Sequence, residues 1–302
     1  MNHSKIRIQK PFLKWVGGKT QIIQNVINKI PEKINNYHEP CVGGGSVLFA
    51  ILSLKEQKKI NIEGNIYAYD INESLINVYK SIQNHKDELL DLIESYMEEY
   101  DVLNGTTINR KPQTIEEAKT SKESYYYWMR QLYNSLPKSD IKRCALFICL
   151  NKTCFRGMYR EGPNGFNVPY GHYKKTPKMM TKYEINIISK MIQDVIFICC
   201  DFQYVFQSLE KNDMIYIDPP YAPENEKSFV QYVADGFNLQ DHLRLFTMIK
   251  NLDKSVKFVM SNSNVELVKN AFQSYGCETI PVRRAINSKH PDSIAKEVII
   301  YN

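Results

Sequence analysis

Apolar positions along the chain follow two periods, one typical of strands and one typical of helices. Short apolar runs, each of which predicts a buried strand, lie at residues 195–200, 214–217, 256–262 and 296–302. Two stretches with apolar residues at helical spacing lie between these runs, at 239–252 and 264–276. Strands and helices that alternate in this way predict an α/β domain.

The N-terminal quarter of the chain shows the same alternation. "YHEPCVGGGSVLFAIL" (37–52) predicts a short strand, a glycine turn and a helix. "NIYAYDINESLINVY" (65–79) predicts a second strand that ends at Asp70 and a helix that Asn72 begins. Residues 76–150 have a helical, charged pattern, and the Gly- and Pro-rich segment that follows predicts a long loop or hairpin. We therefore predict one α/β domain, residues 1–75 and 190–302, interrupted by a mainly helical insertion at 76–189.

Positive charge is concentrated in one part of the predicted insertion. Residues 138–184 hold ten of the 39 Lys and Arg residues but three of the 33 Asp and Glu residues, so the rest of the chain is close to neutral. A solvated lysine-rich face would explain such a segment in many proteins. Because aromatic residues are interleaved with the charges here, we expect a surface that binds the phosphate backbone of a nucleic acid.

Composition excludes several other classes of protein. No apolar run approaches the ~20 residues that a membrane-spanning helix needs. The seven cysteines lack CxxC spacing, so we expect reduced thiols in a cytoplasmic protein. The six histidines are dispersed, and we predict no metal site.

The glycine turn and Asp70 suggest a nucleotide-type ligand. "EPCVGGGS" (39–46) follows a strand and precedes a helix, so its amide groups can approach a ligand closely. An acid that ends the next strand can accept hydrogen bonds from ribose hydroxyls, although Asp70 would equally suit a helix cap. The turn lacks GxGxxG spacing, and no GK[ST] follows it, which argues against an NTPase. NAD and S-adenosylmethionine both remain open at this point.

The sequence Asp218-Pro219-Pro220-Tyr221 directly follows an apolar strand and favours S-adenosylmethionine. A residue before proline is held in extended geometry, which fixes Asp218, and the two prolines stiffen the chain so that the Pro219 carbonyl is a rigid acceptor. Tyr221 adds an aromatic face. Two acceptors beside a ring match an exocyclic amine on a planar base, such as N6 of adenine, and can sharpen that amine as a nucleophile for a sulfonium methyl group.

Five motifs together resemble the Dam-type N6-adenine DNA methyltransferases, and most closely the members that methylate GATC. The motifs stand in that family's order and span nearly the whole chain. They are "FLKWVGGK" (12–19), "EPCVGGGSVLF" (39–49), "YAYDINESLINVY" (67–79), "FNVPYGHYKK" (166–175) and "DPPYAP" (218–223). The resemblance implies a doubly wound, seven-stranded mixed sheet of the Rossmann-like methyltransferase type.

The resemblance also implies roles for individual residues. Asp218, Pro219, Pro220 and Tyr221 match the family's catalytic motif. Residues that match cofactor-contacting positions are Trp15, Lys19, Glu39, Gly43, Gly45, Asp70, Asp201, Phe202 and Asp218. Residues that match DNA-contacting positions are Lys14, Phe155, Met158, Arg160, Pro169 and Tyr173.

Within the DNA-contacting set, an arginine such as Arg160 can bind guanine O6 and N7 together, and apolar side chains at 155 and 158 can wedge into the duplex while a base is flipped. The segment "CFRGMYREGPNG" departs from the family pattern at Arg156, where a small polar residue is common. The target sequence is therefore less firmly implied than the reaction.

The resemblance implies a metal-independent enzyme that uses S-adenosylmethionine, acts on double-stranded DNA and works as a monomer. It belongs to restriction-modification or to solitary DNA methylation, and any cognate restriction endonuclease acts separately. Covalent cytosine methylation is not expected, because Pro40-Cys41 lies within the glycine turn, where a base could not reach the thiol. Three alternatives stay open: a different target sequence, an RNA or protein amide substrate, and a non-catalytic DNA-binding protein with this fold.

Overall fold

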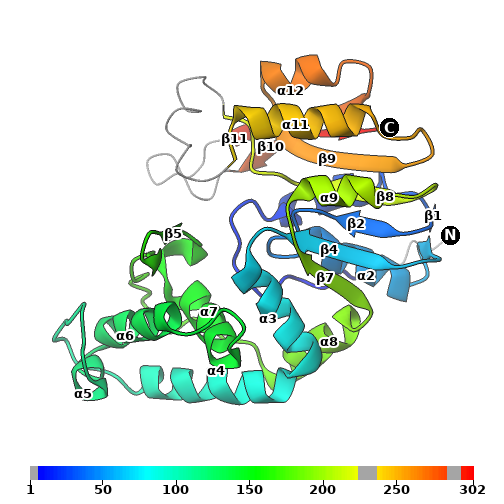
Figure 1. The fold of residues 1–302 in the computed structure, drawn as a ribbon. Coiled ribbons are helices and arrows are strands. Elements are labelled where there is room, and N and C mark those ends of the chain that lie inside the picture. Colours follow the sequence, from blue (N-terminus) through cyan, green and yellow to red (C-terminus); the bar gives the residue numbers. More distant parts are fainter. Residues whose placement is uncertain (1–5, 224–236, 284–293) are drawn as a thin grey trace. The chain divides into compact units, whose positions relative to one another are not determined.

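The computed structural model describes residues 6–223, 237–283 and 294–302. The chain forms two compact units (Figure 1). The sheet unit contains residues 1–10, 19–71 and 194–302, and the helical unit contains residues 11–18 and 72–193. The short segment 11–18 therefore joins the helical unit ahead of its main part. None of the helices in the described part of the chain combines the length and apolarity that crossing a bilayer requires.

A seven-stranded mixed sheet organises the sheet unit, with the strand order β10-β11-β9-β8-β2-β4-β7. Its strands are β2 (Tyr37–Glu39), β4 (Ile66–Asp70), β7 (Val195–Cys199), β8 (Met214–Ile217), β9 (Lys257–Ser263), β10 (Gly276–Arg283) and β11 (Ile294–Tyr301). The five strands β7, β4, β2, β8 and β9 pair in parallel, and β11 is antiparallel to both of its neighbours. The chain order reverses between β2 and β8, and open α/β sheets bind ligands at the carboxyl ends of their strands beside such a reversal.

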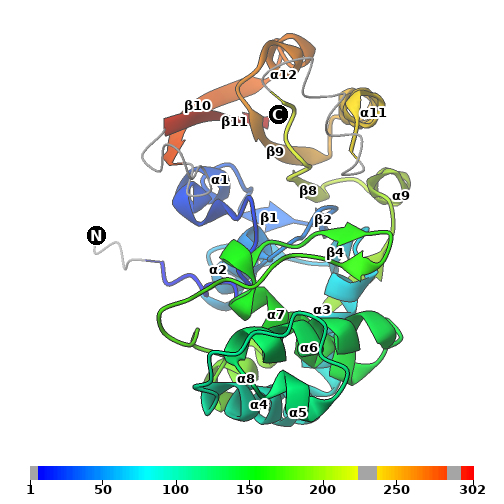
Figure 2. The same cartoon turned by 90° about the vertical axis from the view of Figure 1, so that its left-hand side faces the viewer.

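Helices cover both faces of this sheet (Figure 2). On one face α9 (Phe202–Gln207), α11 (Leu239–Lys250) and α12 (Glu266–Ala271) bury alternate residues of β8, β9 and β11. On the other face lie α1 (Ile23–Ile27) and α2 (Ser46–Glu56). The 3-10 helix η1 (Lys19–Gln21) precedes α1, and β1 (Lys33–Ile34) pairs with β3 (Asn61–Ile62). Because both faces are covered, the central strands β2, β8 and β9 are buried at nearly every position, including polar ones such as His38 and Asn262.

The helical unit is built around α7 (Ile141–Thr153), in which every residue from Arg143 to Asn151 is buried. Helices α3 (Glu73–Asn84), α4 (Lys86–Asp101) and α6 (Lys122–Ser135) pack against it. The remaining elements are α5 (Ile115–Ala118), η2 (Phe155–Gly157), α8 (Lys182–Ile192) and the hairpin of β5 (Glu161–Gly162) and β6 (Gly165–Phe166). The helical pattern of residues 76–150 is confirmed.

The predicted fold class is confirmed, with two local differences. The strand at 214–217 and the end of β4 at Asp70 agree with the sequence analysis. The helix predicted at 264–276 is shorter, because α12 ends at Ala271. Strand β10 was not predicted, since it contains Pro281 and alternates exposed with buried residues. Proline is tolerated there because β10 is an edge strand that pairs only with β11.

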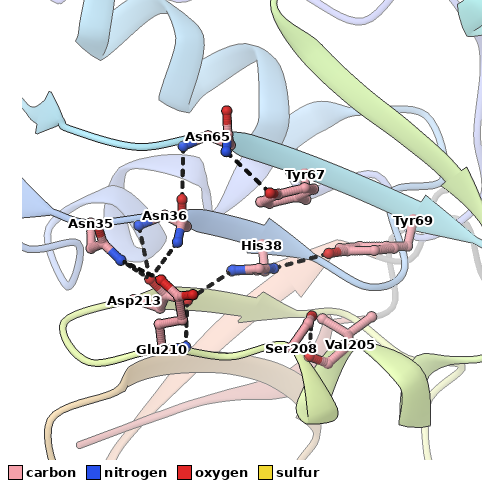
Figure 3. Close-up of polar contacts among 10 residues, drawn as sticks. All are labelled: Asn35, Asn36, His38, Asn65, Tyr67, Tyr69, Val205, Ser208, Glu210 and Asp213. Atoms are coloured by element: carbon pink, nitrogen blue, oxygen red, sulfur yellow. Dashed lines mark hydrogen bonds and ion pairs between the residues drawn. The ribbon is translucent and has the colours of Figure 1, made fainter.

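A buried polar network ties the starts of β2 and β8 together (Figure 3). The fully buried carboxylate of Asp213 accepts hydrogen bonds from the Asn36 amide (2.9 Å), the Glu210 amide (2.8 Å) and His38 Nε2 (3.1 Å). Burial lowers the pKa of His38, so the ring is neutral and its Nδ1 accepts from the Tyr69 hydroxyl at 3.0 Å. This network satisfies polar groups that would otherwise be buried without partners.

Replacement of Asp213 should strongly destabilise the protein. Asp213→Ala leaves several buried donors unpaired, and we expect a loss of about 3–5 kcal/mol in the free energy of unfolding. Asp91→Ala, a change of an exposed carboxylate on α4, should cost less than about 0.5 kcal/mol. Urea titration of both variants measures the difference, and equal stability of the two would contradict the assigned role of Asp213.

Candidate active site

Four acidic residues follow parallel strands at the same edge of the sheet. Glu39 and Asp70 are the last residues of β2 and β4. Asp201 comes two residues after β7, and Asp218 directly follows β8. Since these strands are neighbours and run in the same direction, their carboxyl ends meet, and the sheet brings together acids from four separate parts of the sequence.

Two groups at this edge, Cys41 and Glu39, have pKa values that burial and nearby carboxylates raise. Burial raises the pKa of the Cys41 thiol, and the charges of all four acids raise it further. Burial also raises the pKa of Glu39 to about 8, with a contribution from the charge of Asp218. The Tyr37 hydroxyl donates to Glu39 at 2.7 Å. Glu39 is therefore largely protonated at neutral pH, and the raised pKa of Cys41 favours the protonated thiol over the nucleophilic thiolate.

The glycine turn is fixed to Asp70. The Gly43 amide donates to Asp70 Oδ2 at 3.0 Å, and Gly43 and Gly45 have positive φ angles of 49° and 75°. Positive φ favours glycine at both positions, and Gly45 leads directly into α2. The alternative role of Asp70 as a helix cap is wrong, because Asn72 caps α3 through the Leu75 amide at 3.1 Å.

Asp218 forms a buried ion pair. Lys19 Nζ lies 2.8 Å from Asp218 Oδ2, and the two side chains are 4% and 20% exposed. The hydroxyl of Ser261, on β9, donates to Asp218 Oδ1 at 2.8 Å and also contacts the Tyr216 hydroxyl at 2.8 Å. Both carboxylate oxygens are thus held in place, and each keeps a further lone pair for a ligand.

The charge state of Asp218 depends on these two partners. Burial raises the pKa of Asp218, whereas the charge and hydrogen bond of Lys19 and the hydrogen bond of Ser261 act in the opposite direction. An ammonium group in contact with a poorly hydrated carboxylate favours its ionised form. Lys19 is therefore the main group that keeps this carboxylate negative.

The end of β9 and the middle of β11 hold the rest of the motif. Asn262 Oδ1 accepts from the Ala222 amide at 3.1 Å, and the Ser263 hydroxyl donates to the Ala222 carbonyl at 2.5 Å. The Tyr221 hydroxyl donates to Glu297 Oε2 at 2.8 Å, and Lys19 Nζ lies 4.8 Å from the centre of the Tyr221 ring. The sequence analysis missed these anchoring residues. The polar run "SNSN" that ends an otherwise apolar strand is the signal that could have found them.

Asp201 and Phe202 are held by a residue that the sequence analysis also missed. Asp201 caps α9 through the Gln203 amide at 2.9 Å and forms an ion pair with Arg244 at 2.9 Å. The Arg244 guanidinium lies 4.3 Å from the centre of the Phe202 ring, which is buried. The pair is therefore rigid at the carboxyl end of β7.

The helical unit gathers the residues predicted to contact DNA. Lys14 Nζ lies 3.4 Å from the Tyr173 hydroxyl, and the Lys14 amide donates to Asn151 Oδ1 at 2.9 Å. Gly157 has a φ angle of 67°, and a Cβ atom there would come within 2.4 Å of the Lys14 side chain. The Phe155 amide donates to the Pro169 carbonyl at 2.8 Å, and Phe155 is 41% exposed.

Arg160 leads into the small hairpin of β5 and β6. Its Nε donates to Asn167 Oδ1 at 2.6 Å, and its carbonyl accepts from the Asn167 amide at 3.1 Å. Asn134 bonds both the amide (2.8 Å) and the carbonyl (3.0 Å) of Phe166. Arg160 is therefore an exposed guanidinium on a fixed support, near the half-buried Met158.

Trp15 differs from the other predicted cofactor residues because it belongs to the helical unit. Its ring stacks on Tyr159 at 5.8 Å and on Phe147 at 6.3 Å between ring centres. All the other predicted cofactor residues belong to the sheet unit. A cofactor contact of Trp15 stays a prediction.

The carboxyl edge of the sheet suits a ligand that is planar and rich in donors. A fixed carboxylate (Asp218) stands three residues before an aromatic ring (Tyr221), and more acids and a glycine turn lie along the same edge. Acidic strand ends of this kind accept hydrogen bonds from amino and hydroxyl groups. In the described residues no cluster of three or more His, Cys, Asp or Glu side chains could hold a metal ion.

Comparisons with known proteins identify the family. The model of the D12 class N6 adenine-specific DNA methyltransferases matches residues 15–287. Type II methyltransferase M.MjaIII of Methanocaldococcus jannaschii is 36% identical over 291 residues, 93% of each chain. Type II methyltransferase M1.LlaDCHI of Lactococcus lactis subsp. cremoris is 30% identical over 96% of this chain and 93% of its own.

A third relative, the DNA adenine methylase of Haemophilus influenzae, is 29% identical over 95% of this chain and 91% of its own. The family match covers the glycine turn, Asp70 and the Asp218–Tyr221 motif, which lie within residues 15–287. The chain belongs to the D12 class of N6 adenine-specific DNA methyltransferases.

Proposed function

We propose that the protein transfers the methyl group of S-adenosylmethionine to N6 of adenine within GATC in duplex DNA, after the base has been flipped out of the stack. The observation that carries this proposal is the partly buried Asp218 carboxylate, held by Lys19 and Ser261 at the carboxyl end of β8. Membership of the D12 class supports the reaction.

The hydrogen-bond acceptors and the glycine turn at the carboxyl edge of the sheet fit the chemical groups of the cofactor. Asp70 offers carboxylate oxygens for ribose hydroxyls, and the turn at Gly43 and Gly45 allows close approach of the main chain. Phe202 and Asp201 offer a fixed apolar face and an acceptor for an adenine ring. When bound, S-adenosylmethionine supplies an electrophilic methyl group.

The residues of the motif would activate the target amine. Asp218 and the Pro219 carbonyl accept hydrogen bonds from the two protons of the amino group, and the Tyr221 ring stacks on the base. Both acceptors favour the form of the amine whose lone pair is localised and can attack. Asp218 is also placed to receive the proton that the amine loses after transfer.

The helical unit would read the target sequence. Arg160 suits a guanine in the major groove, and Lys14 and Tyr173, which contact each other in the same unit, would add further contacts. Phe155 and Met158 would enter the space that the flipped base leaves. The hairpin support at Asn134 and Asn167 is consistent with direct readout, because a base contact needs a side chain of fixed direction.

Loss of the negative charge at Asp218 should stop methyl transfer. Asp218→Asn keeps the size of the side chain, and we expect the single-turnover rate to fall by about 100-fold or more, while DNA affinity at low salt changes little because phosphate contacts supply most of it. Asp91→Asn is the matched control. A variant that retains more than a tenth of the wild-type rate, about 1.4 kcal/mol of barrier, would rule out the carboxylate role.

Removal of the Lys19 charge should change the pH dependence of the rate. Lys19 lowers the pKa of Asp218, so in Lys19→Met that pKa rises and the acid limb of the kcat profile should move to higher pH. Lys33→Met, at an exposed lysine of the same unit, is the control. An unchanged acid limb with a weaker affinity for the cofactor would instead make Lys19 a cofactor contact alone.

Sequencing of modified bases tests the target. DNA from a host without adenine methylation that expresses this chain should carry N6-methyladenine in GATC, and Arg160→Ala should spread it to sequences changed at one guanine, a loss of about 1–3 kcal/mol of discrimination. Methylation by the wild type within another sequence would overturn GATC but not the reaction. Equal weakening of Arg160→Ala on all sequences would make Arg160 a phosphate contact.

A further inference from the structure

A basic cleft lies on the helical unit, outside the segment 138–184 that holds the excess of positive charge. Its volume is about 530 Å³. The residues that line it are Arg110, Lys111, Gln113, Tyr127, Arg130 and Gln131. Tyr127, Arg130 and Gln131 belong to α6, where spacings of three and four residues place side chains on one face of a helix.

The loop that carries Arg110 and Lys111 is fastened to the start of α6. The Asn109 amide donates to the Ser124 hydroxyl at 2.8 Å, and Thr106 forms a β-bridge with Ser121. Arg110 Nε lies 2.9 Å from the carboxylate of the buried Glu123. The cleft is thus assembled from two segments in fixed contact.

Two guanidinium groups lie over the same aromatic ring. Arg130 lies 4.6 Å and Arg110 lies 6.0 Å from the centre of the Tyr127 ring, which is 7% exposed. A guanidinium stacked on an aromatic face keeps its N–H edge available for an anion and is weakly hydrated, which favours paired hydrogen bonds to phosphate. Glu123 offsets the charge of Arg110, and Lys111 and Arg130 leave the cleft positive.

Residues of α6 next to the cleft also hold the segment that follows the hairpin of β5 and β6. Arg130 donates to the Val168 carbonyl at 3.2 Å, and the Tyr126 hydroxyl donates to the same carbonyl at 2.7 Å. Val168 lies two residues after β6 and directly before Pro169. A duplex that binds the hairpin and the cleft would therefore contact one continuous piece of the protein.

We propose that this cleft binds a backbone phosphate of the DNA duplex outside the bases that the hairpin reads. The proposal rests on the proposed function, because it takes duplex DNA as the substrate. The cleft supplies affinity and no sequence information, since a phosphate is the same at every base pair.

Removal of two cleft charges tests the proposal through salt dependence. In Lys111→Gln/Arg130→Gln the slope of log affinity against log salt should fall by about one, and affinity for the duplex should fall about tenfold at 0.1 M salt, with the methylated sequence unchanged. Arg110 is kept, because its loss would deprive the buried Glu123 of its nearer cationic partner at 2.9 Å. Lys254→Gln/Lys257→Gln, two exposed lysines before and at the start of β9 in the sheet unit, is the matched control.

Replacement of single DNA phosphates by neutral groups identifies the phosphate that the cleft binds. In a series of duplexes with single methylphosphonate linkages, one position outside the methylated sequence should weaken binding of the wild type and leave the double variant unaffected. Lys111→Gln alone should show about half of the slope change. Because it changes a single exposed side chain, it tests the cleft without the risk that the variant fails to fold. Equal responses of wild type and variants at every position would overturn the proposal.

Two other outcomes separate a free-anion site in the cleft from a failure of the proposed function. If inorganic phosphate at matched ionic strength raises the melting temperature of the wild type but not of the double variant, while both bind the duplex equally, the cleft is a site for a free anion and the proposal is wrong. If the wild type methylates no DNA, the proposed function fails first. Methylation within a sequence other than GATC leaves this test intact, because the scan uses whichever duplex the enzyme methylates.

Discussion

The ion pair between Lys19 and Asp218 is the interaction on which the candidate active site depends. A carboxylate at a buried strand end tends to take up a proton, and the neutral acid would be a weaker acceptor for an amine. The ammonium of Lys19, 2.8 Å away, opposes this tendency. Buried ion pairs contribute little net stability after the cost of desolvation, so this pair is better explained by the charge it preserves than by folding.

Sheet order explains why distant parts of the chain meet at that pair. Strand β8 lies between β2 and β9, so Asp218 has Glu39 on one side and Ser261 on the other. Strand β11 then brings Glu297 within 2.8 Å of the Tyr221 hydroxyl. The motif is stiffened by its prolines and also by hydrogen bonds from two neighbouring strands.

The sequence predicted those features that local chemistry determines. An apolar run that ends in Asp218-Pro219-Pro220-Tyr221 predicted both strand β8 and the carboxylate that follows it, and the acid at the end of β4 was found in the same way. Ser261, Glu297 and Arg244 were missed, because their roles arise from strand and helix neighbours that only the folded chain defines. The basic cleft was missed for a similar reason, since α5 and the first part of α6 separate Arg110 from Arg130 in the sequence. Edge strand β10 was not predicted because about half of its residues are polar or exposed.

Strand β8 is only four residues long and has a different kind of carboxylate at each end. Asp213 at its start is sealed inside a structural network, and Asp218 at its finish faces the carboxyl edge of the sheet. Substitutions at the first end would lower the amount of folded enzyme, whereas under the proposed role of Asp218 substitutions at the second would lower turnover per molecule. A genetic screen that scores only the methylation level of cellular DNA would assign both to one phenotype, and protein abundance must be quantified alongside it to separate them.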